Sequence, residues 1–297
     1  MIFRELELLE QQLAPRVDGI HVLDFRAVKL TNLGEINTAV YLSRVLPSAL
    51  SEDGSEYLKN CEVKEFVREL IDKNLVFSFD LACDLIDNKT DKVYFKPLNV
   101  SDSVVRNLYR KVNEVFPIIP SVEKIIFKLA SIRSVDSPSH HCSSLYFMCL
   151  KNRKGIFERA SFYFNLTNVP IYPDDERVFM EDFFRQEIFN KAPEDIKKIY
   201  TSIREFVDES HAALKLVGID VGNDSSIKQK LYFYVLDEEK TIDDLLDVDY
   251  FSTELKRNLY AVTSDSRVSK KYCLKFFYIT KVDGDQFNLN LYFLPRE

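Results

Sequence analysis

The sequence predicts an α+β fold, a ten-stranded antiparallel β-barrel built from five αββα repeats, with helices outside and a polar lumen. Two observations predict it. A short strand motif, hydrophobic residue–Tyr–apolar residue, recurs five times, and stretches of helical periodicity separate the copies. The copies are Val40-Tyr41-Leu42, Val93-Tyr94-Phe95, Leu145-Tyr146-Phe147, Leu231-Tyr232-Phe233 and Leu291-Tyr292-Phe293. Ten antiparallel strands close readily into a barrel whose lumen can hold a ligand.

Each copy is predicted to be the second strand of a hairpin. The five predicted hairpins pair 25–30 with 38–45, 76–83 with 92–98, 125–134 with 143–150, 214–221 with 229–236, and 272–280 with 288–293. Helices are predicted at 56–72, 103–115, 176–189, 192–210, 241–247 and 252–260. Segment 153–166 is open to two interpretations, because Phe162-Tyr163-Phe164 is typical of a strand while a helix keeps the count at five hairpins. We favour the helix, and we assign residues 1–297 to a single domain.

Alternation along the strands predicts a sheet with two different faces. Successive side chains in a strand point to opposite faces, so Lys92 and Tyr94 share one face, opposite Val93. In the fourth copy, Lys230 and Tyr232 share the corresponding face. Helices can cover the apolar face, which leaves the ammonium and phenol groups to line the lumen. Such a lumen suits an anionic ligand.

Composition excludes several functional classes. The net charge of −7 argues against a nucleic-acid partner, and no apolar run is long enough to predict a membrane span. Five scattered Cys without CxxC spacing fit reduced thiols, and Met1–Leu13 does not resemble a signal peptide, so we expect a cytoplasmic protein. Four His disfavour a multi-His metal site, and neither GxGxxG nor GxxxxGK occurs.

Two predicted hairpins resemble those of a known family. Ile132–Asp136 followed by His140–Phe147, and 218–221 followed by 227–234, are similar to the third and fourth hairpins of aromatic prenyltransferases of the ABBA type. The similarity is to the branch that prenylates 4-hydroxyphenylpyruvate and phenazines, and it extends over about residues 25–293. The family fold, the PT barrel, is a ten-stranded antiparallel barrel of five αββα units with catalysis inside.

The resemblance implies transfer of an allylic prenyl group, dimethylallyl or geranyl, from its diphosphate to an electron-rich aromatic small molecule. The reaction is a Friedel–Crafts-type substitution of secondary metabolism, and no cofactor is implied. Magnesium is not expected to be required, because no Asp or Glu lies between Thr38 and Val45, where magnesium-dependent members carry an acidic ligand. Arg44 lies near an Arg of the metal-independent branch, but strict alternation from Tyr41 points it outward, and without a bulge in the strand it is not a ligand.

The resemblance also implies roles for individual residues. Diphosphate binding falls to Lys92, Lys230, Tyr94, Tyr232, Ser144, Asn288 and Lys275, of which Asn288 stands where members often have Lys and Lys275 is a possible compensation. Tyr146, Tyr234 and Tyr292 are expected to shield the carbocation or line the acceptor pocket. By strand parity alone, Asp80 and Asp220 are candidate catalytic bases. No metal ligand is predicted.

Simpler interpretations stay open. A single Lys-x-Tyr is common on the wet face of a strand, adjacent His140 and His141 are a poor chelate, and the acidic run 237–239 is typical of a helix start. The alternative functions are prenylation of an aromatic side chain in a peptide, and a non-catalytic barrel that binds an anionic small molecule. A monomer is expected.

Overall fold

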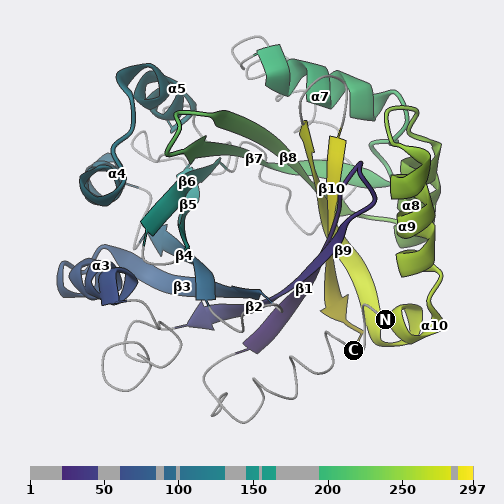
Figure 1. The fold of residues 1–297 in the computed structure, drawn as a ribbon, viewed down its shortest axis with the longest axis horizontal. Coiled ribbons are helices and arrows are strands. Elements are labelled where there is room, and N and C mark those ends of the chain that lie inside the picture. Colours follow the sequence, from purple (N-terminus) through teal and green to yellow (C-terminus); the bar gives the residue numbers. More distant parts are fainter. Residues whose placement is uncertain are drawn as a thin grey trace.

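The computed structural model describes residues 22–45, 61–84, 90–97, 101–130, 145–153, 156–164, 194–281 and 287–296. Its strands form one closed ring in the order β1-β10-β9-β8-β7-β6-β5-β4-β3-β2 (Figure 1). They are β1 Val22–Leu30, β2 Ile36–Val45, β3 Val76–Asp84, β4 Thr90–Pro97, β5 Leu145–Arg153, β6 Ile156–Phe164, β7 Ala212–Gly222, β8 Ile227–Val235, β9 Tyr272–Lys281 and β10 Phe287–Pro295.

All neighbouring strands are antiparallel, and the pairing of β1 with β10 closes the ring. Arg26 lies opposite Phe293 at this seam. Closure satisfies the backbone groups that an edge strand would leave unpaired. An antiparallel sheet that curls upon itself, with helices around it, is thereby confirmed.

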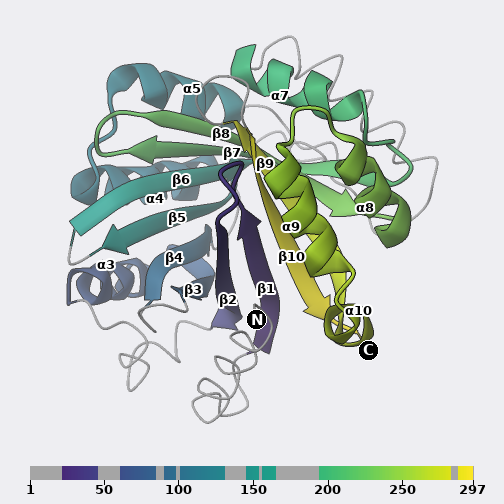
Figure 2. The same cartoon turned by 45° about the vertical axis from the view of Figure 1, so that its right-hand side comes forward.

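The described helices lie outside the ring (Figures 1 and 2). They are α3 Cys61–Asp72, α4 Asp102–Val115, α5 Pro120–Ala130, α7 Glu194–Arg204, α8 Glu238–Asp247, α9 Thr253–Thr263 and α10 Ser266–Lys271. None of these helices is both long enough and apolar enough to cross a membrane. In α3 the side chains of Val63, Phe66, Val67 and Leu70 recur at helical spacing and are all buried, so one face of the helix packs on the barrel.

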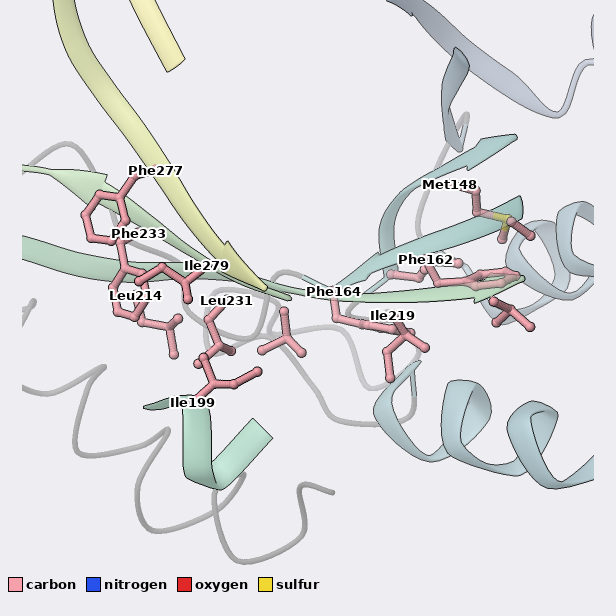
Figure 3. Close-up of a cluster of buried hydrophobic side chains, with 14 of the residues drawn as sticks. Met148, Phe162, Phe164, Ile199, Leu214, Ile219, Leu231, Phe233, Phe277 and Ile279 are labelled. Atoms are coloured by element: carbon pink, nitrogen blue, oxygen red, sulfur yellow. The ribbon is translucent and has the colours of Figure 1, made fainter. Parts of the chain in front are cut away.

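The main hydrophobic core lies between the helices and the outer face of the strands. Figure 3 shows part of it, where Ile199 of α7 lies beside Leu214 and Leu231 on the barrel wall. Phe233 stacks on Phe277 with 5.0 Å between the ring centroids. Val93 belongs to the same core, so the predicted division of β4 and β8 into an apolar face and a polar face is confirmed.

The third hairpin differs from its prediction. The predicted strand at 125–134 begins within helix α5, and the predicted helix at 153–166 contains strand β6. Pro120 begins α5, a first-turn position at which its missing N–H has no helical partner to lose. The buried side chains of this helix, Val122, Ile126 and Leu129, recur at helical spacing. The segment was interpreted as a strand because its composition is typical of strands. The true hairpin is β5–β6, in which Arg153 lies opposite Ile156.

Predicted helices at 192–210, 241–247 and 252–260 correspond to α7, α8 and α9. The acidic run does start a helix, since Asp237 is the N-cap of α8 and its carboxylate accepts a hydrogen bond from the Lys240 backbone N–H at 3.2 Å. The predicted helix at 176–189 and the pair His140–His141 lie outside the described residues.

Candidate active site

A cavity of about 180 Å³ lies inside the ring and is lined by side chains of β1, β2 and β4 to β10. Its lining divides into a cationic part and an aromatic part. The cationic part consists of five side chains, Lys29, Lys92, Lys151, Arg159 and Lys230. We call this set the cationic cluster.

Three members of the cationic cluster lie side by side on neighbouring strands. Lys92 of β4 is directly opposite Lys151 of β5, and Lys151 is directly opposite Arg159 of β6. Like charges in directly opposite positions destabilise a sheet. Lys151 forms an ion pair with Glu158 at 3.9 Å, which is long for such a pair. Such a row of cations is costly in an empty barrel and favourable around a polyanion.

Lys29 experiences the same repulsion between like charges. Its pKa lies below the ordinary 10.5, first because burial disfavours the charged amine and then because Lys92 and Lys230, with Lys228 and Arg159, repel it. An anion in the cavity would reverse the repulsive part of this shift. The electrostatics of the cluster therefore also favour a bound anion.

Asp220 of β7 is the one carboxylate among the described residues that line the cavity, and it is 1% exposed. Its Oδ2 lies 2.7 Å from Lys230 Nζ and 3.3 Å from Arg159 Nη1. Burial by itself raises the pKa of Asp220, but the charge and hydrogen bond of Lys230, with Arg159 and the Ser161 hydroxyl, outweigh it and hold the pKa below its usual value. Burial likewise lowers the pKa of Lys230, and Asp220 raises it above normal. Both groups are charged at neutral pH.

The aromatic part of the lumen adjoins the cationic cluster. We call it the aromatic floor; its rings are Tyr94, Phe147, Tyr163, Tyr232, Tyr278 and Tyr292. Tyr163 stacks on Phe147 with a centroid separation of 4.3 Å, and Tyr232 lies 4.5 Å from Tyr278. Lys230 Nζ lies 5.1 Å from the centroid of the Tyr278 ring, so at least one face of the floor already contacts a cation. Burial raises the pKa of Tyr163 and Tyr232, which keeps both phenols neutral.

Gly218 provides the space in which two rings of the floor meet. A methyl group at this position would lie 3.2 Å from two ring carbons of Tyr163 and 3.3 Å from a ring carbon of Tyr232. These contacts are tighter than ordinary van der Waals separation, and both rings are buried. The absence of a side chain at Gly218 therefore sets the packing of the floor.

We expect Gly218→Ala to displace the two rings and to lower the free energy of unfolding by about 1–3 kcal/mol, the usual cost of overpacking. Urea unfolding measures the loss. Because the chain contains no Trp, near-UV circular dichroism reports directly on its Tyr and Phe rings, and this signal should change as well. If both the unfolding midpoint and the near-UV spectrum match those of the wild type, the absence of a side chain at Gly218 does not set the packing of the two rings.

The structure brings together five of the residues singled out from the sequence. Lys92, Tyr94, Asp220, Lys230 and Tyr232 all line the cavity. Tyr292 belongs to the aromatic floor, where its ring centroid lies 5.9 Å from that of Tyr278 and 6.5 Å from that of Tyr232.

Other predicted residues lie elsewhere. Tyr234 is outside the cavity lining and packs its ring on Phe276 at 5.1 Å. The Asn288 side-chain oxygen accepts a hydrogen bond from the Asn32 backbone N–H at 3.3 Å, next to the β1–β2 turn. Lys275 falls where the β9–β10 register shifts, and it does not line the cavity either. The residue of β10 that does line the cavity is Asn290.

The side chains of three predicted residues lie outside the described part of the structure. Asp80 lies in β3 with its backbone opposite Tyr94, but the side chains of Asp80 and Tyr146 are outside the described ones. Ser144 lies outside the described residues altogether. In β5 the register shifts between Leu145 and Phe147, and Phe147 rather than Tyr146 supplies the described ring to the floor.

Strict alternation also fails in β2. The β2–β3 register shifts between Leu42 and Val45, so one residue in this interval breaks the pattern that was used to discount Arg44. Parity therefore does not decide on which face Arg44 lies, and its side chain is outside the described ones.

Lys29, Lys151, Arg159, Tyr163 and Tyr278 were missed from the sequence. Lys29 could have been found, because it alternates with the buried Val28 and Leu30. Arg159 was missed because β6 was interpreted as a helix, and Lys151 was missed because the predicted strand ended at residue 150, whereas β5 continues to Arg153. A signal for that hairpin exists in Lys154-Gly155, a Gly-containing pair between two strand-like runs.

Comparison with known proteins gives a fold but no close relative. No family model matches the sequence, and no curated protein matches it. Solved structures match over most of the chain. The 6-dimethylallyltryptophan synthase from Micromonospora olivasterospora superposes with a TM-score of 0.58 at 9% identity, covering 93% of this chain and 83% of that chain. The chain has the fold of aromatic prenyltransferases.

Two further structures agree. A 6-dimethylallyl tryptophan synthase gives a TM-score of 0.56 at 10% identity, covering 93% of this chain and 84% of that one. The prenyltransferase PriB gives 0.51 at 14% identity, covering 93% and 82%. The resemblance inferred from the sequence is thus confirmed for the fold, over nearly the whole described barrel.

Proposed function

We propose that the protein transfers an allylic prenyl group from its diphosphate to an electron-rich aromatic small molecule inside the barrel. One observation supports this most strongly: the cationic cluster directly adjoins the aromatic floor within one cavity. An anion-binding region beside a layer of Tyr faces matches the two products of allylic ionisation, a diphosphate and a carbocation. In this proposal the chain consists of five αββα repeats, with β1–β2, β3–β4, β5–β6, β7–β8 and β9–β10 as their hairpins.

The cationic cluster would bind the diphosphate. A polyanion bridging Lys92, Lys151 and Arg159 replaces their mutual repulsion with charge-assisted hydrogen bonds. Stabilising the charge that develops on a leaving group is usually the largest single catalytic contribution. Lys230, which lies between Asp220 and the floor, would contact the same ligand from β8.

The aromatic floor would face the prenyl chain. When the C–O bond of the donor breaks, its electron pair leaves with the diphosphate and the allylic carbon becomes cationic. Tyr faces stabilise such a cation by about 0.5–2 kcal/mol each. The arene then forms the new C–C bond and loses a proton. Asp220 is a weak acceptor for that proton because it is ion-paired with a lowered pKa, so Asp80 is the better candidate base.

The donor set of the cavity favours binding without magnesium. Mg²⁺ prefers carboxylate and water oxygens, whereas the described lining offers five cationic side chains and a single carboxylate that already forms two ion pairs. The diphosphate charge would then be neutralised by Lys and Arg alone.

The size of the cavity favours a short donor. Its volume of about 180 Å³ is below the roughly 300–1,000 Å³ usual for drug-sized ligands, so we propose dimethylallyl rather than geranyl diphosphate. The Micromonospora structure contains DMASPP and Trp, which fits a donor of this length and a bicyclic arene as acceptor. We further propose that the protein acts as a monomer in the cytoplasm.

Two alternatives remain as outcomes of experiment. In the first, the acceptor is an aromatic side chain in a peptide, which would need access through one end of the barrel. In the second, the barrel is not catalytic and binds the anion without turnover. Both share the anion site, so a test of donor binding precedes any test of chemistry.

The test is thermal unfolding in EDTA, with and without a non-hydrolysable dimethylallyl diphosphate analogue. A ligand that binds only the folded state at about 100 times its Kd stabilises it by roughly 2.7 kcal/mol, so the midpoint should rise clearly. Dimethylallyl alcohol, which has the same chain without the anion, is the control and should leave the midpoint unchanged. No shift with dimethylallyl, geranyl and farnesyl analogues, with magnesium also added, would overturn the proposed function.

A further inference from the structure

A carboxylate is an unexpected component of an anion-binding cavity. Asp220 lines the cavity at 1% exposure, among five cationic side chains. Its negative charge opposes that of any diphosphate bound there, and burial makes the opposition stronger because little water screens it. A residue that weakens binding of the ligand needs a compensating role.

The contacts of Asp220 indicate that role. Two cations from different strands, Lys230 of β8 and Arg159 of β6, converge on the same oxygen, Oδ2, at 2.7 and 3.3 Å. This is the arrangement in which two such cations would hold one phosphate oxygen. Asp220 Oδ1 is buried and has no hydrogen-bond partner among the described groups. The carboxylate thus pairs with both cations through one oxygen, while its other oxygen accepts no hydrogen bond from the described groups.

We propose that Asp220 is a resident counter-ion that competes with diphosphate for Lys230 and Arg159, and so limits the affinity of the cavity for the pyrophosphate product. When the donor enters, both cations turn from Oδ2 toward phosphate oxygens. When pyrophosphate remains after transfer, Asp220 recovers them and promotes its release. This inference rests on the proposed function, and it makes Asp220 a positioning residue rather than a catalytic base.

The lowered pKa of Asp220 supports this role. A carboxylate that stays ionised at neutral pH can exchange partners with a phosphate, whereas a group that accepts the proton of the arene needs a pKa nearer neutrality. Anion affinity tests the counter-ion role directly. Loss of a competitor for Lys230 and Arg159 tightens pyrophosphate binding, whereas loss of a group that holds these two cations in place for the ligand weakens it.

The experiment is calorimetric titration of inorganic pyrophosphate, in EDTA, into the wild-type protein and Asp220→Asn. We expect at least about a tenfold lower Kd for the variant, equivalent to about 1.4 kcal/mol, together with a lower thermal midpoint. Tighter binding by a less stable protein is a combination that a structural role does not produce. Asp249→Asn is the matched control, since it changes the net charge equally at an exposed site outside the cavity lining.

A second comparison applies if Asp220→Asn does not fold. In Lys230→Gln, Asp220 still holds Arg159, and adding Asp220→Asn removes both charges of the buried pair together. The double variant should bind pyrophosphate more tightly than Lys230→Gln alone. Equal or weaker binding in either comparison would overturn the counter-ion role. If the wild-type protein and every variant fail to bind pyrophosphate, the anion site itself is absent and the proposed function falls first.

Discussion

Replacing Lys92 and Lys230 together with Met is expected to weaken binding of the dimethylallyl diphosphate analogue by roughly 10²–10⁴-fold. Each of these side chains lines the cavity and would make a charge-assisted hydrogen bond to the diphosphate, worth about 1.5–3 kcal/mol. Two such bonds correspond to the stated range at about 1.4 kcal/mol per factor of ten. Calorimetric titration of the analogue measures the loss directly and needs no knowledge of the acceptor.

Lys96→Met is the matched control for this variant. Lys96 lies on the same strand, β4, but it does not line the cavity, so the affinity should stay within about twofold of the wild type. A second pair, Lys92→Met with Lys151→Met, leaves the Asp220 ion pair intact and removes two cations that face each other. This double variant should bind the diphosphate analogue more weakly than the wild type. Its stability should be equal or higher, because binding groups that repel each other lower the stability of the folded protein. If the affinity of both pairs equals that of the wild type, these cations do not bind the diphosphate.

Lys230→Met alone is expected to lower the free energy of unfolding by about 3–5 kcal/mol at pH 7, because it leaves Asp220 ionised and buried with only its longer contact to Arg159. Adding Asp220→Asn removes the uncompensated charge and should recover a large part of this loss. Urea unfolding of the wild type and of the three variants measures the coupling as a double-mutant cycle. A loss of stability in the double variant equal to the sum of the losses in Lys230→Met and Asp220→Asn would show that the pair is not coupled in the folded state.

The pH dependence gives an independent check of the same pair. The pKa of Asp220 is lowered in the folded state, so its contribution to stability is present above its ordinary value of 3.8 and is lost as the pH falls through the folded value. The pKa of Lys230 is raised, so its contribution is present below 10.5 and is lost as the pH rises through the folded value. In Lys230→Met, burial instead dominates the Asp220 pKa and raises it. The variant should then regain stability relative to the wild type on mild acidification, and a constant difference between pH 7 and pH 5 would contradict this.

The barrel was predictable where strands alternate without interruption. In β4 and β8 the buried Val93, Phe95, Leu231 and Phe233 alternate with the lumen side chains, so Lys92 and Lys230 could be placed from the sequence. The hydrophobic effect imposes this period of two wherever one face of a sheet meets a core. These two strands supplied most of the site that was correctly predicted.

The rest of the site depended on features that alternation does not encode. A register shift lies in β5 next to Phe147, which belongs to the aromatic floor, and another lies beside Lys275 in β9. Such irregularities follow from how each strand fits its neighbours around the ring, which the local sequence does not reveal. Because β6 was interpreted as a helix, Arg159 and Tyr163 were lost with it, although they complete both parts of the cavity.

The seam between β1 and β10 has a consequence for biosynthesis. Arg26 and Phe293, which face each other there, are separated by nearly the whole described chain. At the usual ribosomal rate of about 5–20 residues per second, β1 must wait roughly 13–50 s for its final partner to be made. Throughout that interval β1 has an open edge that can pair with other nascent chains. The lumen that the cationic cluster lines is not yet closed. The growing chain therefore has a long window of vulnerability that ends only when the last strand emerges, and holding chaperones would act during that window.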